Sequence, residues 1–262
     1  MRFIRWLFGA AVTLLLLQNA WADEAWQANA SQAQAVFEQA TGRPLRAGHR
    51  VEPTVFPGYY AVRSGGPGDP AAYFRDDMVW TGNVRSAGWS AVSESESSAE
   101  GQTRWLKEQV KNLPLDRLIL VKRSKPPVAV IWSAPDCPFC RRLESALERE
   151  DVSVYVAPVG LSADGYQLSS EVYCAKDAAK AWTAAMQGSQ VDSTPKPLCT
   201  YPRDMLGDIG FFIGRGRIVT PIVAFADGTT ITGWDDERAL ARLREKIAQQ
   251  VFFPPRVVPD VK

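Results

Sequence analysis

Two cysteines separated by two residues, Cys137 and Cys140, constrain this chain more than any other feature of its sequence. They follow a strongly apolar run, Val128–Ser133, and they begin a pattern of apolar residues at helical spacing that extends to Glu150. The pattern predicts a buried strand, a short turn and a helix that starts at the first cysteine. A Cys-x-x-Cys pair is found in metal sites, haem attachment sites, structural disulfides and redox centres.

The start of the chain predicts export from the cytosol. Arg2 and Arg5 precede an apolar run from Trp6 to Leu17, and Ala20-Trp21-Ala22 places small residues at the expected cleavage position. That run is about a dozen residues long, which is shorter than the ~20 residues that a single membrane-spanning anchor needs. We therefore interpret residues 1–22 as a cleavable signal peptide and expect the mature protein to have left the reducing cytosol.

The composition excludes one class of partner. The formal net charge is +1 and 46% of the residues are hydrophobic, so the chain lacks the basic excess that nucleic acid requires. The same apolar content is enough for one large core or two small ones. The only histidine, His49, lies on a polar stretch flanked by arginines, which indicates a surface residue and not a catalytic base.

Residues 23–92 predict a small domain with one helix and an antiparallel sheet. Apolar residues recur at helical spacing from Glu24 to about Ala40. Three strand patterns follow, at Val51–Val62, Ala71–Arg75 and Met78–Val84, and Pro57-Gly58 interrupts the first of them. The apolar residues are too few for a generous core, and pairing with a second copy would supply the rest. We predict a dimerisation-type domain here.

The second half of the chain predicts an α/β domain. Residues 93–114 are expected to form a polar linker and a linker helix at Thr103–Asn112, and a domain follows over residues 115–250. Its expected strands are Leu118–Lys122, Val128–Ser133, Val152–Ala157, Thr220–Ala226 and Thr229–Thr232, and its expected helices are Cys137–Glu150, Ser169–Met186, Asp204–Ile213 and Asp235–Ile247. This β-α-β, helical insert and β-β-α order is the layout of a thioredoxin-like domain. We assign no function to the proline-rich tail, residues 251–262.

Four cysteines are present, and in an oxidising compartment an even number indicates two disulfides. Four thiols allow three connectivities, of which the spacing favours Cys137 with Cys140 and Cys174 with Cys199. The second bond closes a loop of about 25 residues, which the chain-entropy model values at roughly 3.5 kcal/mol.

The same spacing argues against metal and haem. A zinc site with four cysteine ligands draws on two close pairs, whereas Cys174 and Cys199 are far apart and His49 lies in the other domain. Covalent haem requires Cys-x-x-Cys-His, and residue 141 is an arginine. We therefore expect neither a metal nor a cofactor.

A purely structural disulfide is the remaining alternative to a redox pair. The position of the pair at a helix N-terminus argues against it, because free backbone N–H groups and the helix dipole stabilise a thiolate there. A later strand of the same domain also begins with Thr220-Pro221. We predict that Cys137 attacks and that Cys140, one turn further in, resolves. Phe139 adds an apolar face, whereas the charge of Asp136 disfavours the thiolate.

With these features the sequence resembles the DsbC/DsbG family of periplasmic thiol:disulfide isomerases over nearly the whole mature chain. The motifs that carry the resemblance are Cys137-Pro138-Phe139-Cys140; Val172-Tyr173-Cys174-Ala175-Lys176-Asp177 followed by Ala178–Trp182; Cys199; Gly216 four residues before Thr220-Pro221; and Asp227-Gly228 followed by Gly233. The Tyr-Cys-Ala-Lys-Asp stretch is the most specific of them, because it belongs to the helical insert and not to thioredoxin-like domains in general.

The resemblance implies a set of residue roles and partners. It assigns a redox pair, Cys137 and Cys140; a structural disulfide, Cys174 with Cys199; and substrate contacts at Phe139, Thr220 and Pro221, the last as a cis-proline. It also implies homodimers joined through residues 23–92, misfolded disulfide-containing exported proteins as substrates, and a membrane electron donor that recycles the thiols. Two positions depart from the family pattern, because Val219 replaces a small residue and Ala134 replaces an acid that has moved to Asp136.

These departures leave the direction of electron flow open. One alternative is a thiol oxidase or reductase dedicated to one client, such as a conjugation, secretion or cytochrome-maturation component. A second is a periplasmic chaperone whose thiols are secondary and whose cleft is lined by apolar residues of the N-terminal domain, namely Phe56, Tyr59, Tyr60 and Trp80. Large apolar side chains more often form a core, so the sequence favours a thiol-disulfide enzyme over a chaperone.

Overall fold

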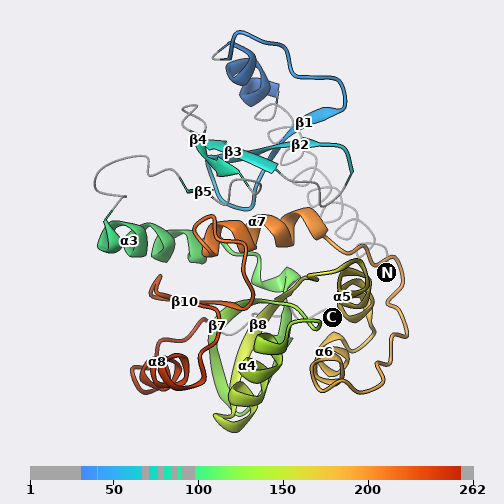
Figure 1. Ribbon diagram of the computed structural model, residues 1–262, viewed down its shortest axis with the longest axis vertical. Coiled ribbons are helices and arrows are strands. Elements are labelled where there is room, and N and C mark those ends of the chain that lie inside the picture. The colour runs from blue at the N-terminus through green and yellow to red at the C-terminus, as the bar shows by residue number, and fades with distance from the viewer. Residues whose placement is uncertain are drawn as a thin grey trace, which may run out of the picture.

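The computed structural model describes residues 31–39, 41–66, 71–75, 80–83, 88–89 and 98–254. The expected signal peptide, residues 93–97 of the expected linker and the tail from residue 255 lie outside this range. These described residues form two five-stranded sheets, and helices lie between them and around the second sheet (Figure 1).

The N-terminal sheet is an antiparallel meander. Its strands follow the order β1 (His49–Pro53), β2 (Tyr59–Ser64), β3 (Ala71–Arg75), β4 (Trp80–Asn83) and β5 (Gly88–Trp89). Thus the expected strand over residues 51–62 is two strands of a hairpin, and Tyr59 donates its N–H to the Phe56 carbonyl across the turn at Pro57-Gly58. Residues 31–39 form a helix, and a small core joins it to the sheet through Ala33, Val51, Val62 and Phe74.

The second sheet has the strand order β10-β9-β7-β8-β6. Its strands are β6 (Ile119–Val121), β7 (Lys125–Ser133), β8 (Val152–Pro158), β9 (Ile222–Phe225) and β10 (Thr230–Thr232). The central strands β7 and β8 are parallel, and the other pairs are antiparallel. Because helices cover both faces, β8 is buried along its whole length and β7 from residue 127 onward.

Five helices surround this sheet and a sixth, α3, precedes it: α3 (Ala99–Gln109), α4 (Pro138–Arg149), α5 (Ala163–Cys174), α6 (Ala178–Met186), α7 (Arg203–Ile213) and α8 (Asp236–Ala248). The expected linker helix starts earlier than Thr103, because Ser98 caps α3 by accepting the Gly101 N–H. The expected single helix over residues 169–186 is two helices, since Ala175 is extended and Asp177 caps α6. No helix in the described part of the chain is long and apolar enough to cross a membrane.

The N-terminal sheet shares a core with α7, which lies between the two sheets (Figure 1). The rings of Phe56 and Phe212 lie 4.3 Å apart, and those of Tyr73 and Phe211 stack at 4.2 Å. Both Phe56 and Tyr59 are buried in this core, so neither lines an open cleft. The apolar residues of the small N-terminal sheet therefore pack against a helix that lies more than 130 residues further along the chain.

A buried ion pair lies in the same interface. Arg63 Nη2 lies 2.6 Å from both carboxylate oxygens of Asp208 on α7, and the Tyr73 hydroxyl donates to Asp208 at 2.8 Å. Burial raises the pKa of Asp208 to about 6, although both partners stabilise its ionised form. Loss of one partner would leave the other charge buried and unpaired, which is the expensive case for such pairs.

We predict that Arg63→Met lowers the free energy of unfolding by about 3–5 kcal/mol at neutral pH, because it leaves the Asp208 carboxylate without a counter-charge. The pKa of Asp208 lies above that of an unfolded aspartate, so its ionisation lowers stability as the pH rises from about 4 through about 6. Arg63 limits that loss. The substitution should therefore cost more at about pH 8 than at about pH 5, measured by urea unfolding.

Arg50→Met is the matched control, since Arg50 pairs with Asp204 of the same helix at 3.0 Å but is one-third exposed. It should cost less than about 1 kcal/mol at either pH. Equal losses for the two variants would contradict a special role for the buried pair.

Candidate active site

The dithiol lies where β7 gives way to α4. Cys137 is the N-cap of α4 and its Sγ accepts the Cys140 N–H at 3.4 Å. Pro138 occupies the first helical position, where its missing N–H leaves no hydrogen bond unmade. Cys137 and Cys140 are both free thiols. The sulfur of Cys137 therefore sits at the positive end of the helix dipole, where a thiolate is stabilised.

The two thiols differ in their surroundings, although both are buried. Cys137 is 2% exposed and its Sγ donates to the Thr220 carbonyl at 3.6 Å. Cys140 is 0% exposed, and its Sγ accepts the Ala134 N–H at 3.5 Å. Burial raises the pKa of the Cys140 thiol to about 12, so this thiol is protonated at neutral pH.

The loop after α7 brings Thr220 and Pro221 against the dithiol. The Thr220–Pro221 peptide bond is cis, and the Thr220 carbonyl is the atom that contacts Cys137. Ile218 and Val219 of this loop are exposed, and so is Phe139 on α4. Val219, where the sequence departs from the family pattern, thus contributes to an apolar surface and not to the core.

Asp136 precedes Cys137, and the sequence predicts that its negative charge disfavours a thiolate there. Its carboxylate instead accepts the N–H groups of Leu161 and Ser162, at 3.1 and 2.9 Å, and the Ser162 hydroxyl at 2.9 Å. These donors stand just before α5, so the negative charge is stabilised by another helix N-terminus. A Cβ on Gly165 would lie 2.0 Å from Asp136 Oδ2, so this approach requires a glycine.

The arginines that follow the dithiol, Arg141 and Arg142, are exposed, and each makes a contact near the start of α4. Arg141 Nε turns back and donates to the Pro135 carbonyl at 2.9 Å. The Arg142 guanidinium lies 4.7 Å from the centre of the Phe139 ring and 3.5 Å from an Asp236 oxygen on α8. Both side chains thereby help to hold the start of α4.

Cys174 and Cys199 are joined by a disulfide. The bond links the end of α5 to the loop that leads into α7, and the Lys196 N–H also donates to the Cys174 carbonyl at 2.7 Å. The helical insert is held from its other side by Trp182 of α6, whose Nε1 donates to the buried Glu144 of α4 at 3.3 Å. The Cys174–Cys199 disulfide is therefore separate from the dithiol of Cys137 and Cys140.

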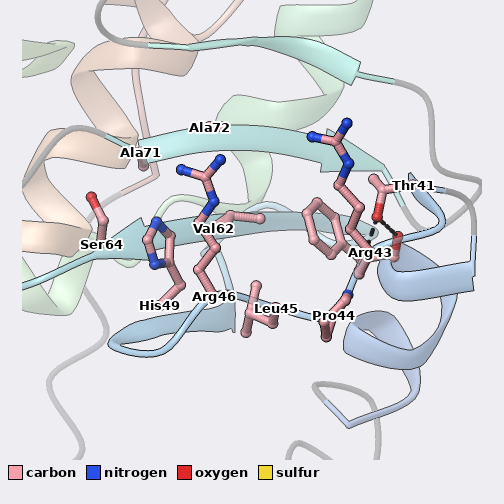
Figure 2. A pocket seen from close by; sticks show the side chains of 11 residues that line it. Thr41, Arg43, Pro44, Leu45, Arg46, His49, Val62, Ser64, Ala71 and Ala72 are labelled. Atoms are coloured by element: carbon pink, nitrogen blue, oxygen red, sulfur yellow. Dashed lines mark hydrogen bonds between the residues drawn. The ribbon is translucent and has the colours of Figure 1, made fainter.

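His49 lies at the start of β1, in the sheet that does not carry the dithiol. It lines a cavity of about 690 Å³ together with Arg43, Arg46 and Val62 (Figure 2). Neither Cys137 nor Cys140 lines this cavity. The histidine is half-buried and is not positioned to act on either thiol.

We predict that iodoacetamide modifies Cys137 before Cys140 in the native, reduced protein at neutral pH. The reason is that burial keeps the Cys140 thiol protonated, whereas Cys137 lies at the N-terminus of α4, where its Sγ accepts the Cys140 N–H. Peptide mass spectrometry over time measures the order, and urea-unfolded protein is the control in which both react alike. Equal native rates would contradict the prediction.

Comparison with known proteins agrees with this geometry. A model of the thioredoxin-like domain family matches residues 116–248. The probable thiol:disulfide interchange protein DsbC of Bordetella pertussis is 28% identical over 149 residues, which cover 55% of this chain and 51% of that protein. Its counterpart in Bordetella parapertussis is 29% identical over 142 residues, or 50% of this chain and 48% of that protein. The chain spans about half the length of the curated relatives it matches.

Among solved structures, a disulfide interchange protein from Neisseria gonorrhoeae is 31% identical and covers 51% of this chain and 98% of its own, with a TM-score of 0.44. The predicted α/β fold class is confirmed, with a thioredoxin-like domain preceded by a small β-rich part. The predicted resemblance to DsbC proteins is also confirmed, over about half of the chain and not over nearly all of it. By the match over residues 116–248, this chain belongs to the thioredoxin-like domain family.

Proposed function

We propose that this protein is a periplasmic thiol:disulfide interchange enzyme that isomerises or reduces incorrect disulfides in exported proteins. The observation that carries the proposal is the position of Cys137 Sγ, which lies at the start of α4 and 3.6 Å from the carbonyl that precedes Pro221. In this position a substrate peptide can lie along the strand edge while the Cys137 sulfur attacks its disulfide. The similarity to proteins named DsbC supports the same activity.

In the proposed mechanism, Cys137 attacks as a thiolate. It displaces one sulfur of the substrate disulfide, so that a Cys137–substrate bond forms and the other substrate sulfur leaves with the electron pair. The freed substrate thiolate can attack a different disulfide of the same client and return Cys137 unchanged, which is isomerisation. Alternatively, Cys140 loses its proton and attacks Cys137, which releases a reduced substrate and leaves the enzyme oxidised.

Residues around the sulfur are proposed to hold the client. The apolar surface of Phe139, Ile218 and Val219 borders the dithiol and fits unfolded segments with exposed apolar side chains. Pro221 has no N–H and is proposed to present its strand edge to the client, while Thr220 would hydrogen-bond the substrate backbone. A membrane electron donor would return Cys137 and Cys140 to the dithiol form.

Other parts of the chain are proposed to have structural roles. Residues 1–22 act as a signal peptide, and residues 23–92 mediate homodimerisation while packing on α7. The described sheet ends in β1 and β5, so its edges offer backbone groups for a second copy. The Cys174–Cys199 disulfide stabilises the helical insert.

We predict that Thr220→Val lengthens the lifetime of the enzyme–substrate mixed disulfide severalfold without changing the thermal unfolding midpoint, because it removes a hydroxyl and keeps the shape of the side chain. Trapping the mixed disulfide with acid and following its decay by gel measures this. Thr232→Val on β10 is the matched control. Unchanged lifetime and turnover would remove Thr220 from the substrate site.

The decisive experiment is refolding of a scrambled-disulfide substrate by the native protein and by Cys140→Ala, run beside a solution mass measurement. We expect a dimer that still isomerises without Cys140, because only Cys137 is needed to exchange substrate sulfurs. A monomer that only oxidises thiols would overturn the proposal.

The measured reduction potential against glutathione separates the remaining alternative, a dedicated oxidase or reductase for one client. An isomerase must be kept reduced by a donor, whereas an oxidase is reoxidised by an acceptor. The chaperone alternative has less support, because Phe56 and Tyr59 are buried against α7.

A further inference from the structure

A buried serine beside the dithiol has no hydrogen bond of ordinary geometry within the described part of the protein. Ser133 is the last residue of β7 and is 0% exposed, and its Oγ meets only the Cys140 thiol, in an interaction too weak to satisfy normal hydrogen-bond geometry. Two other buried serines behave normally, since Ser153 Oγ donates to the Lys125 carbonyl and Ser169 Oγ to the Val159 carbonyl, each at 2.6 Å. An unsatisfied buried hydroxyl destabilises a fold, so its presence calls for a function.

Ser133 lies at the end of β7, next to the Cys140 sulfur. The next residue, Ala134, donates its N–H to Cys140 Sγ at 3.5 Å, so the end of β7 runs directly against this sulfur. Burial raises the pKa of the Cys140 thiol, and the Ser133 hydroxyl, which lies beside it, acts in the opposite direction. The hydroxyl thus favours the ionised form of the resolving cysteine.

The contact between Ser133 and Cys140 matters for the step in which Cys140 attacks the mixed disulfide. Cys140 must ionise before it can attack, and its apolar surroundings oppose that ionisation. A neutral thiol is a weak acceptor, whereas a thiolate is a strong one, so a donor beside it gains most in the state that attacks. Interactions that strengthen toward the transition state are those that raise the rate.

We propose that Ser133 is a catalytic residue that donates a hydrogen bond to the Cys140 thiolate and speeds resolution of the mixed disulfide. This inference rests on the proposed function. In the step, the Cys140 thiol gives its proton to water, and its sulfur attacks Cys137 Sγ. The Cys137–Cys140 bond forms, the Cys137–substrate bond breaks, and the substrate sulfur leaves with the electron pair and takes up a proton. Ser133 keeps its own proton throughout.

The test follows both steps in one experiment. Reduced protein is mixed with dithiobis-nitrobenzoate in a stopped-flow instrument, and release of the coloured thiolate is recorded. The first equivalent reports attack by Cys137 and the second reports resolution by Cys140, so Cys140→Ala should lose the second phase. For Ser133→Ala we expect an unchanged first phase and a second phase slowed about tenfold, since hydrogen bonds to charged groups are the stronger class.

A pH series strengthens the test. The second phase of Ser133→Ala should reach its half-maximal rate at a higher pH than that of the native protein, because the thiolate has lost a donor. Ser169→Ala is the matched control, since it removes a buried hydroxyl that has a partner. It should lower the unfolding midpoint and leave both phases unchanged, whereas Ser133→Ala should not lower the midpoint.

The outcomes are distinguishable. A native protein with neither phase would overturn the proposed function itself. A native protein with both phases, matched by Ser133→Ala in rate and pH profile, would overturn only the role of Ser133.

Discussion

The packing of α7 against both sheets is the constraint on which the rest of the structure depends. On one face the helix meets Trp132 of β7, whose Nε1 donates to the Leu206 carbonyl at 2.9 Å. A Cβ on Gly210 would lie 2.1 Å from the Trp132 ring, so only glycine permits this approach. On the other face Asp208 and Phe211 contact the N-terminal sheet. Because a loop leads from α7 to Thr220, this packing also positions the strand edge beside the dithiol.

The same architecture gives two nearby thiols different surroundings, which supports the different roles proposed for them. The N-cap position gives Cys137 a backbone donor and the helix dipole, both of which stabilise a thiolate. One turn further in, Cys140 lies under the end of β7, where burial dominates and holds the thiol protonated. The second sulfur therefore depends on the few donors that the strand can offer it. Ala134 supplies one of them, and Ser133 stands at the position of another.

The hydrogen bonds of Asp136 show how the helical insert bears on the site. The Asp136 carboxylate lies next to Cys137 in the sequence, and it accepts the N–H groups that precede α5. That helix is in turn linked by Cys174–Cys199 to the loop before α7. The insert thus connects the surroundings of Cys137 to the helix that carries the cis-proline loop.

Local pattern was enough to predict most of the thioredoxin-like half. The apolar run of β7, the helix beginning at Cys137 and the closing strands near Asp227-Gly228 all lie within two to three residues of their expected bounds. These features depend on contacts between neighbours in the chain, which periodicity and capping residues reveal. The split between α5 and α6 was missed, because an apolar stretch at helical spacing hides a three-residue break from Ala175 to Asp177.

Tertiary structure decided what the N-terminal residues pack against and what surrounds the sulfur atoms. Arg63 and Asp208 are 145 residues apart, and Asp136 and Ser162 are 26 apart, so no local pattern pairs them. In the sequence Ser133 is an ordinary strand end, and only the fold buries its hydroxyl without a hydrogen bond of normal geometry among the described residues. The sequence by itself determined which residues carry the redox chemistry proposed here, because side-chain type and local spacing define a dithiol at a helix start. Only the folded chain decided their charge environment, because burial and long-range hydrogen bonds exist only after distant segments meet.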